Sequence, residues 1–209
     1  MKANDVILIG YSGHALVVAE ALSLSLYNIV GYLEKRKSDS NLLGIEYLGF
    51  EQDEDVLKTI KGILVFPAIG DNFLREKVIG FLNKKGFEFV TAIHPKSNVS
   101  SYCKIGLGSL VCQGAIINPF ATVGNGVIIN TGSIIEHECV INDFAHIAPG
   151  AVLAGNVNVG KGSFIGANSV IKQGVIIGDH VTIGAGSVVL KNIENNTTFA
   201  GNPAKLIIK

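Results

Sequence analysis

Two histidines and two glutamates lie among aliphatic residues in the stretch IIEHECVINDFAH, which runs from Ile134 to His146. A free imidazole titrates near pH ~6.5, so histidine is suited to accept or donate a proton at neutral pH. A carboxylate beside it stabilises the protonated ring. The same residue types also bind metals or pack as satisfied core residues. Which interpretation applies depends on the direction of each side chain.

A repeat of six residues sets those directions. Every sixth residue of one long segment is Val, Ile or Leu, without an insertion: Ile93, Val99, Ile105, Val111, Ile117, Val123, Ile129, Ile135, Ile141, Ile147, Leu153, Val159, Ile165, Ile171, Ile177, Ile183 and Val189. The residue two positions before each of them is small at most repeats. A helix cannot hold this pattern, because six residues rotate by about 600° and scatter the aliphatic side chains around its surface.

A short strand followed by a turn does hold it. In each strand the aliphatic residue and the small residue two before it point inward, because strand side chains alternate. Three strands make one triangular coil, and coils stack at about 4.8 Å. Glycine often follows the aliphatic residue, as at Gly106 and Gly160, and we expect it to serve corners with unusual dihedrals. The pattern resembles the hexapeptide-repeat family, whose fold is a left-handed parallel β-helix; a β-sandwich gives no reason for the period.

This register assigns a direction to each side chain of the opening stretch. His137 and Glu138 follow the inward Ile135 by two and three residues, so both lie at a corner outside the core. His146 stands between two inward residues and points outward. Cys139 belongs to the inward small series, which makes it a poor nucleophile. Cys112 faces outward by the same register, but no histidine adjoins it in sequence. Glu136 is expected to be a solvated corner carboxylate.

Residues 1–92 follow a different pattern and predict a small α/β Rossmann-like domain, ahead of a β-helix and short C-terminal tail over 93–209. The apolar run VILIG at 6–10 is typical of a buried parallel strand, and helical stretches follow it, near 53–60 and near 72–84. Ligands of such sheets bind beyond the carboxyl ends of the strands. One such end leads into a helix N-terminus, which favours phosphate.

Bulk composition excludes several classes of function. The 209 residues carry equal numbers of acidic and basic side chains and no long basic run, which argues against a nucleic-acid partner. Neither a signal-peptide pattern nor an apolar run of the ~20 residues that span a bilayer is present, so no membrane insertion is expected. The three cysteines lack CxxC spacing. We expect a cytoplasmic protein in a reducing compartment.

Five motifs give the chain a closer resemblance. They are GYSGHA at 10–15, AIGDN at 68–72, IEHECVI at 135–141, FAHIAPGAVLAGN at 144–156 and GNPAK at 201–205. Together with a short Rossmann-like domain before a β-helix, they resemble the sialic acid O-acetyltransferase and UDP-4-amino-sugar (bacillosamine-type) N-acetyltransferase family. The resemblance implies a homotrimer with acetyl-CoA bound between neighbouring β-helices. It also implies a nucleotide sugar held partly by the front domain.

The resemblance also implies roles for individual residues. His137 would be the general base, and Glu138 the neighbour that increases its basicity. Acetyl-CoA would contact His146, Gly155, Ala167 and Ala185, with the backbone N–H of Gly155 as a candidate donor to the thioester oxygen. The sugar nucleotide would contact Ser12, Gly13, His14, Glu34, Lys35 and Gly70. Lys35 departs from the acidic pair of some members, which leaves base or sugar specificity open.

The expected reaction is therefore acetyl transfer from acetyl-CoA to a UDP-linked 4-amino-4,6-dideoxy sugar, with no metal. O-acetylation of sialic acid and a GDP or dTDP nucleotide stay open, as does a non-enzymatic scaffold that senses nucleotide sugars. Two further hypotheses lack residues that they require. An NAD domain would need the second and third glycines of GxGxxG, where this chain has Ser12 and Ala15. A zinc hydratase would need a third histidine beside His137 and His146.

Overall fold

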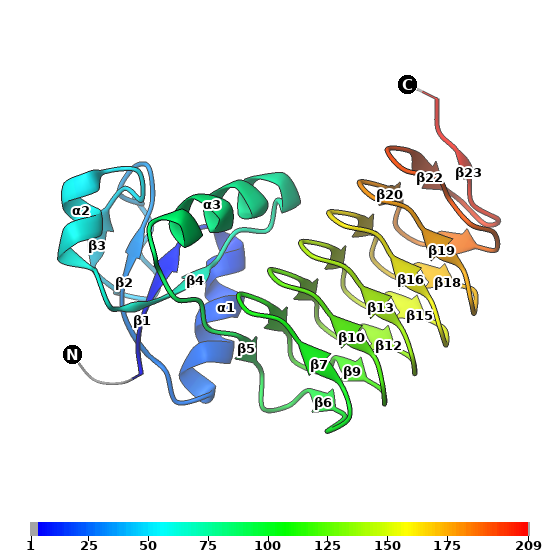
Figure 1. Cartoon of the computed structure of the whole chain (residues 1–209), viewed down its shortest axis with the longest axis horizontal. Helices are drawn as coiled ribbons and strands as arrows, with labels where there is room; N and C mark the ends of the chain where they lie inside the picture. The colour runs from blue at the N-terminus through cyan, green and yellow to red at the C-terminus, as the bar shows by residue number, and fades with distance from the viewer. Residues whose placement is uncertain (1–3, 209) are drawn as a thin grey trace.

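The computed structural model describes residues 4–208 as an α/β front unit followed by a stack of triangular coils (Figure 1). The front sheet is parallel, with strand order β3-β2-β1-β4. Its strands and helices are β1 (Asp5–Ile9), α1 (Gly13–Leu24), β2 (Asn28–Leu33), β3 (Tyr47–Gly49), α2 (Glu54–Thr59), β4 (Leu64–Pro67) and α3 (Asn72–Lys84). The strand predicted at 6–10 and the helices predicted near 53–60 and 72–84 correspond to β1, α2 and α3, whereas β3 is only three residues long and was not predicted.

Alternation along β1 explains the layers of the front unit. Val6 and Leu8 pack with α1 in one buried cluster, whereas Ile7 and Ile9 pack with residues of α2 and α3 in another. A strand that is apolar on both sides needs cover on both faces. The predicted Rossmann-like arrangement is therefore confirmed, with the carboxyl ends of β1, β2 and β4 at one edge of the sheet.

The coils form the left-handed parallel β-helix expected from the repeat. Face 1 consists of β5 (Ala92–Ile93), β8 (Leu110–Val111), β11 (Ile128–Ile129), β14 (His146–Ile147), β17 (Phe164–Ile165) and β20 (Thr182–Ile183). Face 2 consists of β6 (Asn98–Val99), β9 (Ile116–Ile117), β12 (Ile134–Ile135), β15 (Val152–Leu153), β18 (Val170–Ile171) and β21 (Val188–Val189). Face 3 consists of β7 (Lys104–Ile105), β10 (Thr122–Val123), β13 (Val140–Ile141), β16 (Asn158–Val159) and β19 (Ile176–Ile177). The strands β22 (Thr198–Ala200) and β23 (Lys205–Leu206) end the stack as an antiparallel pair on face 1.

Each strand pairs in parallel with the strand one coil further on, as Ile135 does with Leu153. The inward column forms one continuous core, in which Cys139 and Ala145 are completely buried. Every coil thus covers the apolar surface of its neighbours, as expected for a solenoid.

The glycines of the coils follow a rule that differs from our expectation. The glycine directly after the aliphatic residue, such as Gly106, does not have a positive φ; a Cβ there would lie 2.6 Å from the backbone of Gly124 in the next coil. The left-handed position is two residues later, as at Gly108 (φ 68°). Close packing between coils therefore selects glycine at the first position, and backbone conformation selects it at the second.

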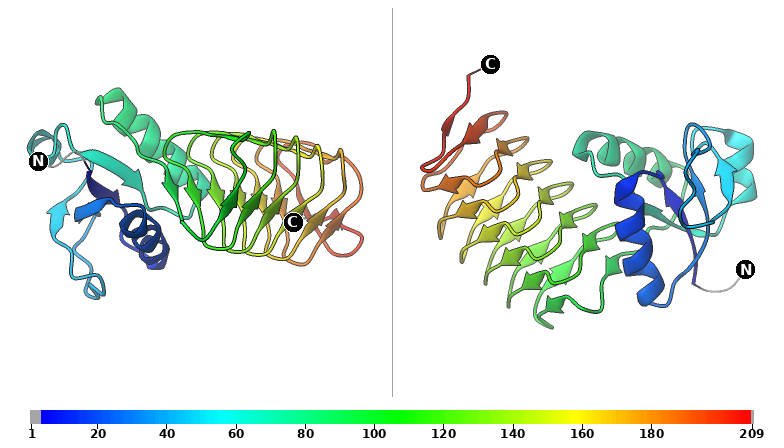
Figure 2. Two further views of the ribbon diagram at one scale, coloured as in Figure 1. Left: turned by 90° about the horizontal axis from the view of Figure 1, so that it is seen from below. Right: turned by 180° about the vertical axis from the view of Figure 1, so that it is seen from behind.

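The front unit packs against face 1 (Figure 2). Arg75 of α3, only 1% exposed, ties the two parts together. Its guanidinium donates from Nε to Gly126 O at 2.6 Å, and from Nη2 to Phe144 O at 2.9 Å, both on the β-helix. Nη1 donates to Ile69 O and Gly70 O at 3.0 and 3.1 Å. One buried cation thus fixes the loop after β4 against the coils.

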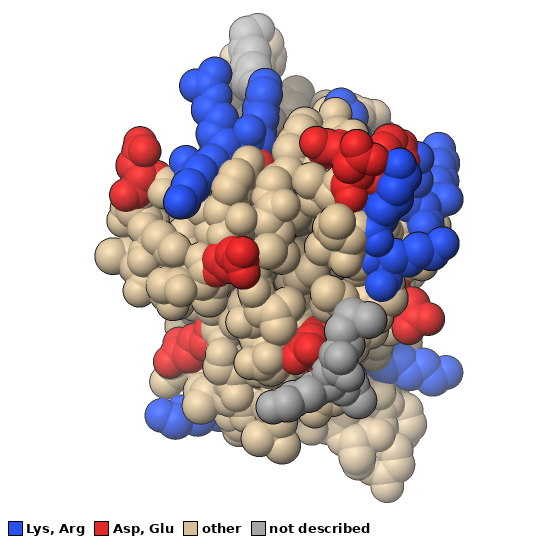
Figure 3. Space-filling model, turned by 90° about the vertical axis from the view of Figure 1, so that its left-hand side faces the viewer, with Lys and Arg blue, Asp and Glu red and all other residues tan. Residues whose placement is uncertain are grey.

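Charged side chains of both signs are mixed on the end of the molecule formed by the front unit (Figure 3). Within residues 4–208, no helix is long and apolar enough to cross a membrane. We propose that the division between the two domains lies at β5, the first strand of the coils.

Candidate active site

His137 and Glu138 lie together at the corner between face 2 and face 3. His137 Nδ1 is 3.0 Å from Glu138 Oε2, and the two side chains are 52% and 63% exposed. Glu138 has a left-handed backbone (φ 62°), a conformation that a residue other than glycine adopts at some cost. If Nδ1 carries the proton that Glu138 accepts, Nε2 is left with a free lone pair. In that tautomer Nε2 can accept a hydrogen bond from a group outside the chain.

Gly155 explains where the imidazole rests. It lies one coil above His137, and a Cβ at Gly155 would stand 2.6 Å from both Nε2 and Cε1 of that ring. Only a residue without a side chain leaves room for the ring in this position. The backbone N–H of Gly155 meets no acceptor among residues 4–208. A proton acceptor and a free N–H donor are therefore adjacent.

His146 occupies a contrasting environment on face 1. It points out of the coil, as its register predicts, but the front unit covers it and leaves it only 9% exposed. Its Nε2 lies 3.1 Å from Asn130 Nδ2, its ring meets the edge of Phe164, and its Nδ1 is buried without a partner. Burial lowers the pKa of His146 to about 4, and the nearby positive charge of Arg75 contributes. His146 is therefore neutral at physiological pH.

The loop after β1 brings His14 to the same place. Ser12 and Gly13 are exposed at the N-terminus of α1. Burial, followed by the charge of Arg75, lowers the pKa of His14 to about 4, and its Nε2 has no partner. Gly70 lies against His14, since a Cβ at Gly70 would meet the histidine at 3.9 Å. Three predicted site residues, His14, Gly70 and His146, are thus neighbours although they are far apart in sequence.

Glu34 and Lys35 follow β2 at the same edge of the front sheet. The Glu34 carboxylate accepts from the backbone N–H of Tyr11 at 3.2 Å and of Lys35 at 2.9 Å. It therefore braces the loop that leads into α1. The Lys35 side chain is exposed. Sequence reasoning did not single out Glu51, which is buried near Glu34 and has its pKa raised by loss of solvent.

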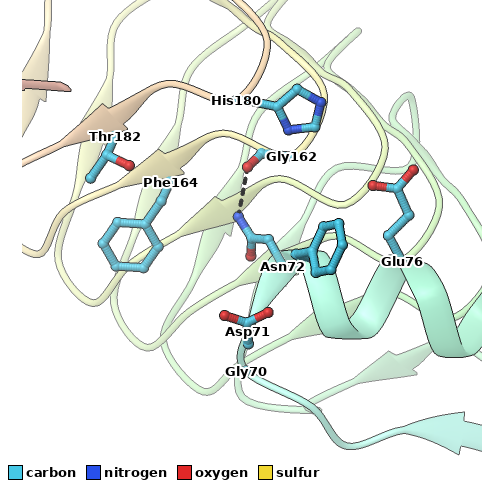
Figure 4. A pocket seen from close by; sticks show the side chains of 9 residues that line it. Gly70, Asp71, Asn72, Glu76, Gly162, Phe164, His180 and Thr182 are labelled. Atoms are coloured by element: carbon cyan, nitrogen blue, oxygen red, sulfur yellow. Dashed lines mark hydrogen bonds between the residues drawn. The ribbon is translucent and has the colours of Figure 1, made fainter. Parts of the chain in front are cut away.

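A cleft of about 340 Å³ separates the N-terminal end of α3 from the β-helix (Figure 4). One wall carries Gly70, Asp71 and Phe73, and the other carries Phe164 and His180. Asp71 caps α3 by accepting from Leu74 N at 2.7 Å, and Asn72 Nδ2 reaches across to Gly162 O at 3.0 Å. The contact of Asn72 joins the N-terminal end of α3 to the coil that carries Gly162. Phe164 contacts the His146 ring and also lines the cleft. The cleft therefore adjoins the cluster of His14, Gly70 and His146.

The predicted site residues fall into three groups at different places around one chain. His137 and Gly155 lie at the corner between faces 2 and 3. That corner of a triangular coil is opposite face 1, which carries His146 and the front unit. Ala167 and Ala185 are stacked at a third place, the corner between faces 1 and 2. A single chain therefore does not bring its proposed base to its own front unit.

Arg75 and Asn130 were missed in the sequence, and the burial of Cys112 was not foreseen. Arg75 stands in the buried stripe of α3 with Val78, Ile79 and Leu82, so its helical spacing was a usable signal of burial. Asn130 directly follows β11, the strand that pairs with β14 and therefore with His146. The six-residue register also indicates that the two residues are close. Cys112 points out of the coil but is fully buried under the front unit, and burial raises its pKa to about 12. A thiol in that state is a poor nucleophile.

Within residues 4–208, no group of three or more His, Cys, Asp or Glu side chains is placed to hold a metal ion.

Two family models match the chain. The PglD N-terminal domain matches residues 5–82, and the bacterial transferase hexapeptide model, with six repeats, matches residues 156–191. The first spans most of the front unit and the second spans two coils.

Solved structures match over nearly the whole length. The acetyltransferase domain of PglB from Neisseria gonorrhoeae, in complex with acetyl coenzyme A, is 33% identical with a TM-score of 0.91, covering 98% of this chain and 99% of that one. The chain belongs to this PglD-type family of hexapeptide-repeat acetyltransferases. PerB from Caulobacter crescentus, in complex with CoA and GDP-perosamine, is 34% identical with a TM-score of 0.91 and coverages of 99% and 98%. WeeI from Acinetobacter baumannii is 26% identical, with a TM-score of 0.85 and coverages of 97% and 99%.

Family membership confirms the resemblance stated from the five motifs. As a PglD-type hexapeptide-repeat protein, the chain is an acetyltransferase. The roles of its individual residues remain predictions.

Proposed function

We propose that the protein transfers the acetyl group of acetyl-CoA to the 4-amino group of a nucleotide-linked 4-amino-4,6-dideoxy sugar, with His137 as general base. The observation that carries this proposal is the His137–Glu138 pair with the His137 ring against Gly155 of the next coil. Acetyl-CoA as donor and an amino sugar as acceptor agree with the ligands of the related acetyltransferases.

The reaction needs one proton acceptor and one oxyanion donor. Nε2 of His137 takes a proton from the sugar amine as its nitrogen attacks the thioester carbon. The Glu138 carboxylate accepts the Nδ1–H and stabilises the imidazolium that forms. The negative oxygen of the tetrahedral intermediate accepts from the Gly155 N–H, a contact worth about 3 kcal/mol in comparable sites. Collapse of the intermediate breaks the C–S bond, and the imidazolium returns its proton to the CoA thiolate.

We propose a homotrimer because a single chain separates the two halves of the site. The outward residues of face 2 are aliphatic from its second strand onward: Ile116, Ile134, Val152, Val170 and Val188. An apolar column of this kind gains by being covered. Contact through face 2 brings the His137 corner of one subunit toward face 1 and the front unit of the next.

In such an assembly, the remaining predicted residues are assigned to one of the two substrates. The groups assigned to acetyl-CoA are His146, Ala167, Ala185 and Gly155, which lie on face 1 or at the edges of face 2. A neutral His146 can hold an uncharged amide or thioester through hydrogen bonds. The sugar nucleotide is assigned to Ser12, Gly13, His14, Glu34, Lys35 and Gly70. The exposed α1 N-terminus and the Lys35 cation suit its diphosphate.

The nucleotide has two candidates. The sequence favoured UDP, whereas the relatives of known structure include a GDP-perosamine complex. We keep UDP as the first candidate and GDP as the second.

The experiment is a panel of nucleotide-linked 4-amino sugars carrying UDP, GDP or dTDP, with sialic acid included, assayed for release of free thiol from acetyl-CoA. We expect turnover of one amino-sugar nucleotide and a loss of about 10³-fold for His137→Ala. Light scattering should give the same trimer for both proteins. Crystals of the perosamine enzyme with asparagine or alanine at one histidine still hold CoA and GDP-perosamine, so we expect His137→Ala to retain ligand binding here. Turnover of sialic acid alone would replace the acceptor, and absence of turnover would favour a sensing scaffold.

A further inference from the structure

Two exposed aromatic side chains stand in the corner column that leads to the proposed base. Tyr102 and Phe120 precede Glu138 by two coils and one coil, and all three follow an inward residue of face 2 by three positions. Tyr102 is 67% exposed, Phe120 is 64% exposed, and their ring centroids are 5.5 Å apart. We refer to Tyr102 and Phe120 as the aromatic pair. Large apolar side chains that gather on a surface mark contact sites.

The helix α1 carries a second exposed apolar group. Val17 and Leu24 are seven residues apart, which places them on one side of the helix, and they are 37% and 49% exposed. We refer to Val17 and Leu24 as the α1 stripe. The opposite side of the helix is buried against the front sheet through Ala15, Ala19 and Leu22. The α1 stripe therefore faces away from the sheet.

The layers of the front unit turn the α1 stripe toward the corner between faces 1 and 2. Arg75 fixes α3 over the corner between faces 3 and 1, where it binds the carbonyls of Gly126 and Phe144. The helix α1 covers the other face of the sheet, so the order across face 1 is α3, sheet and α1 (Figure 2, left). A stripe that faces away from the sheet then points toward the corner that carries Ala167 and Ala185.

The α1 stripe and the aromatic pair lie within the same range of heights along the stack. Ser25 Oγ, at the C-terminal end of α1, donates to Ile93 O of β5 at 2.7 Å. His14, at the N-terminal end, lies beside Gly70 and near His146 of β14. The helix therefore spans the heights from β5 to β14. The turns of the aromatic pair lie between β6 and β7 and between β9 and β10, which fall within that span.

We propose that the aromatic pair of one subunit packs on the α1 stripe of the next subunit in the homotrimer. This inference rests on the proposed function, in which the His137 corner of one subunit faces the front unit of the next. A threefold axis parallel to the coils keeps equal parts of the subunits at one height. The contact removes aromatic and aliphatic surface from water on both sides.

The contact fixes the base of one subunit relative to the sugar-nucleotide loop of the next. Glu138 N donates to Pro119 O at 3.1 Å, so the turn that carries Phe120 supports the turn that carries Glu138. On the other side of the contact, Ser12 and Gly13 begin the helix that carries the α1 stripe. The helix thus connects the aromatic pair of its neighbour to its own nucleotide loop. The site that a single chain leaves divided is assembled across this contact.

A charge pair provides the first test. Tyr102→Lys and Leu24→Glu each place a charge in the contact, so each should raise the concentration at which half of the trimer dissociates by about tenfold or more in sedimentation. The two together should recover at least about fivefold of that loss, because the new charges attract. Leu107→Lys is the matched control, since Leu107 is 61% exposed in the same coil but at the corner between faces 3 and 1. It should leave the trimer unchanged and recover nothing when combined with Leu24→Glu.

A disulfide tests the same contact without dissociating the trimer. Leu24→Cys and Tyr102→Cys are combined with Cys103→Ser, which removes the neighbouring thiol. The α1 stripe and the aromatic pair lie at different places around one chain, so a bond between them joins two subunits. Oxidation should give chains linked in twos and threes on a non-reducing gel. Leu107→Cys in place of Tyr102→Cys should give none.

Either linked chains or recovery by the charge pair supports the contact. Absence of both would overturn it, and so would an unchanged protein that sediments as a monomer. A trimer that shows the contact but acetylates no amino-sugar nucleotide would instead overturn the proposed reaction and leave the contact standing.

Discussion

The corner between faces 2 and 3 and the junction between front unit and β-helix each present a histidine, in opposite environments. His137 is half exposed and has a carboxylate 3.0 Å away. His146 is 9% exposed, lies near Arg75 and His14, and has its pKa lowered to about 4. The first can gain a proton with support from Glu138, whereas the second is held neutral by lost solvation and a nearby cation. In the proposed mechanism, one residue type thus serves proton transfer in one place and neutral contact in the other.

The two places also differ in the sequence distance over which their contacts form. The corner depends on local contacts within two adjacent coils, such as the contact between the His137 ring and Gly155 of the next coil. The junction depends on Arg75, whose hydrogen bonds join segments 51 and 69 residues apart in sequence. We therefore expect changes at the corner to alter catalysis alone, and changes at the junction to alter stability as well.

The largest effect should come from the junction, with Arg75→Met. The substitution keeps most of the side-chain volume but leaves four carbonyls, one buried and three partly buried, without this donor. We expect a loss of about 3–5 kcal/mol in the free energy of unfolding, measured by urea denaturation. Arg36→Met, at an exposed arginine, should change it by less than about 0.5 kcal/mol. Equal effects of the two substitutions would show that the junction does not depend on Arg75.

Gly155→Ala should lower the rate of catalysis at the corner between faces 2 and 3 without changing stability. The added Cβ must displace the His137 ring, which it would otherwise meet at 2.6 Å. Misplacing a catalytic group by about 1 Å costs on the order of 100-fold in rate, so we expect that loss in kcat with an unchanged melting temperature. The control is Gly80→Ala in α3, where a Cβ meets nothing within 4 Å. A fully active Gly155→Ala protein would remove the argument that this glycine positions the base.

Lowering the pH should destabilise the junction. His14 and His146 have pKa values of about 4 in the folded protein, below the ordinary value of 6.5. The unfolded chain therefore binds more protons between these values, and stability falls as the pH drops from 6.5 toward 4. At pH 5 we expect a cost on the order of 1–2 kcal/mol for each histidine. Denaturation at pH 7 and pH 5 should show a shallower dependence for His146→Asn; an identical slope would contradict the assignment.

Glu138→Gln should give the smallest effect. The amide still accepts a hydrogen bond from Nδ1 but does not stabilise the imidazolium as a carboxylate does. We expect kcat to fall by about tenfold, with acetyl-CoA affinity preserved in calorimetry. Glu136→Gln, one residue before His137, should stay within about twofold of the unchanged protein. If both substitutions gave the same rate, Glu138 would have no special part in supporting the base.

The sequence by itself determined the β-helix and the direction of nearly every side chain in it. A period of six combined with strand alternation is a one-dimensional rule, so Ile135, Cys139 and Ala145 could be placed inside, and His137 and Glu138 at a corner, before any coordinates. The eighteen-residue coil then placed Gly155 above His137. The identity of the left-handed corner position was harder, because glycine is selected both by backbone conformation and by contact with the next coil.

Only the tertiary structure decided what covers each outward residue. Register placed both His146 and Cys112 outside the coil, and docking of the front unit buried both. The same docking joined His14, Gly70 and Arg75 around His146. Such contacts join segments tens of residues apart, and no local periodicity encodes them. The solvation of a histidine, and with it the choice between proton transfer and neutral contact, follows from that packing.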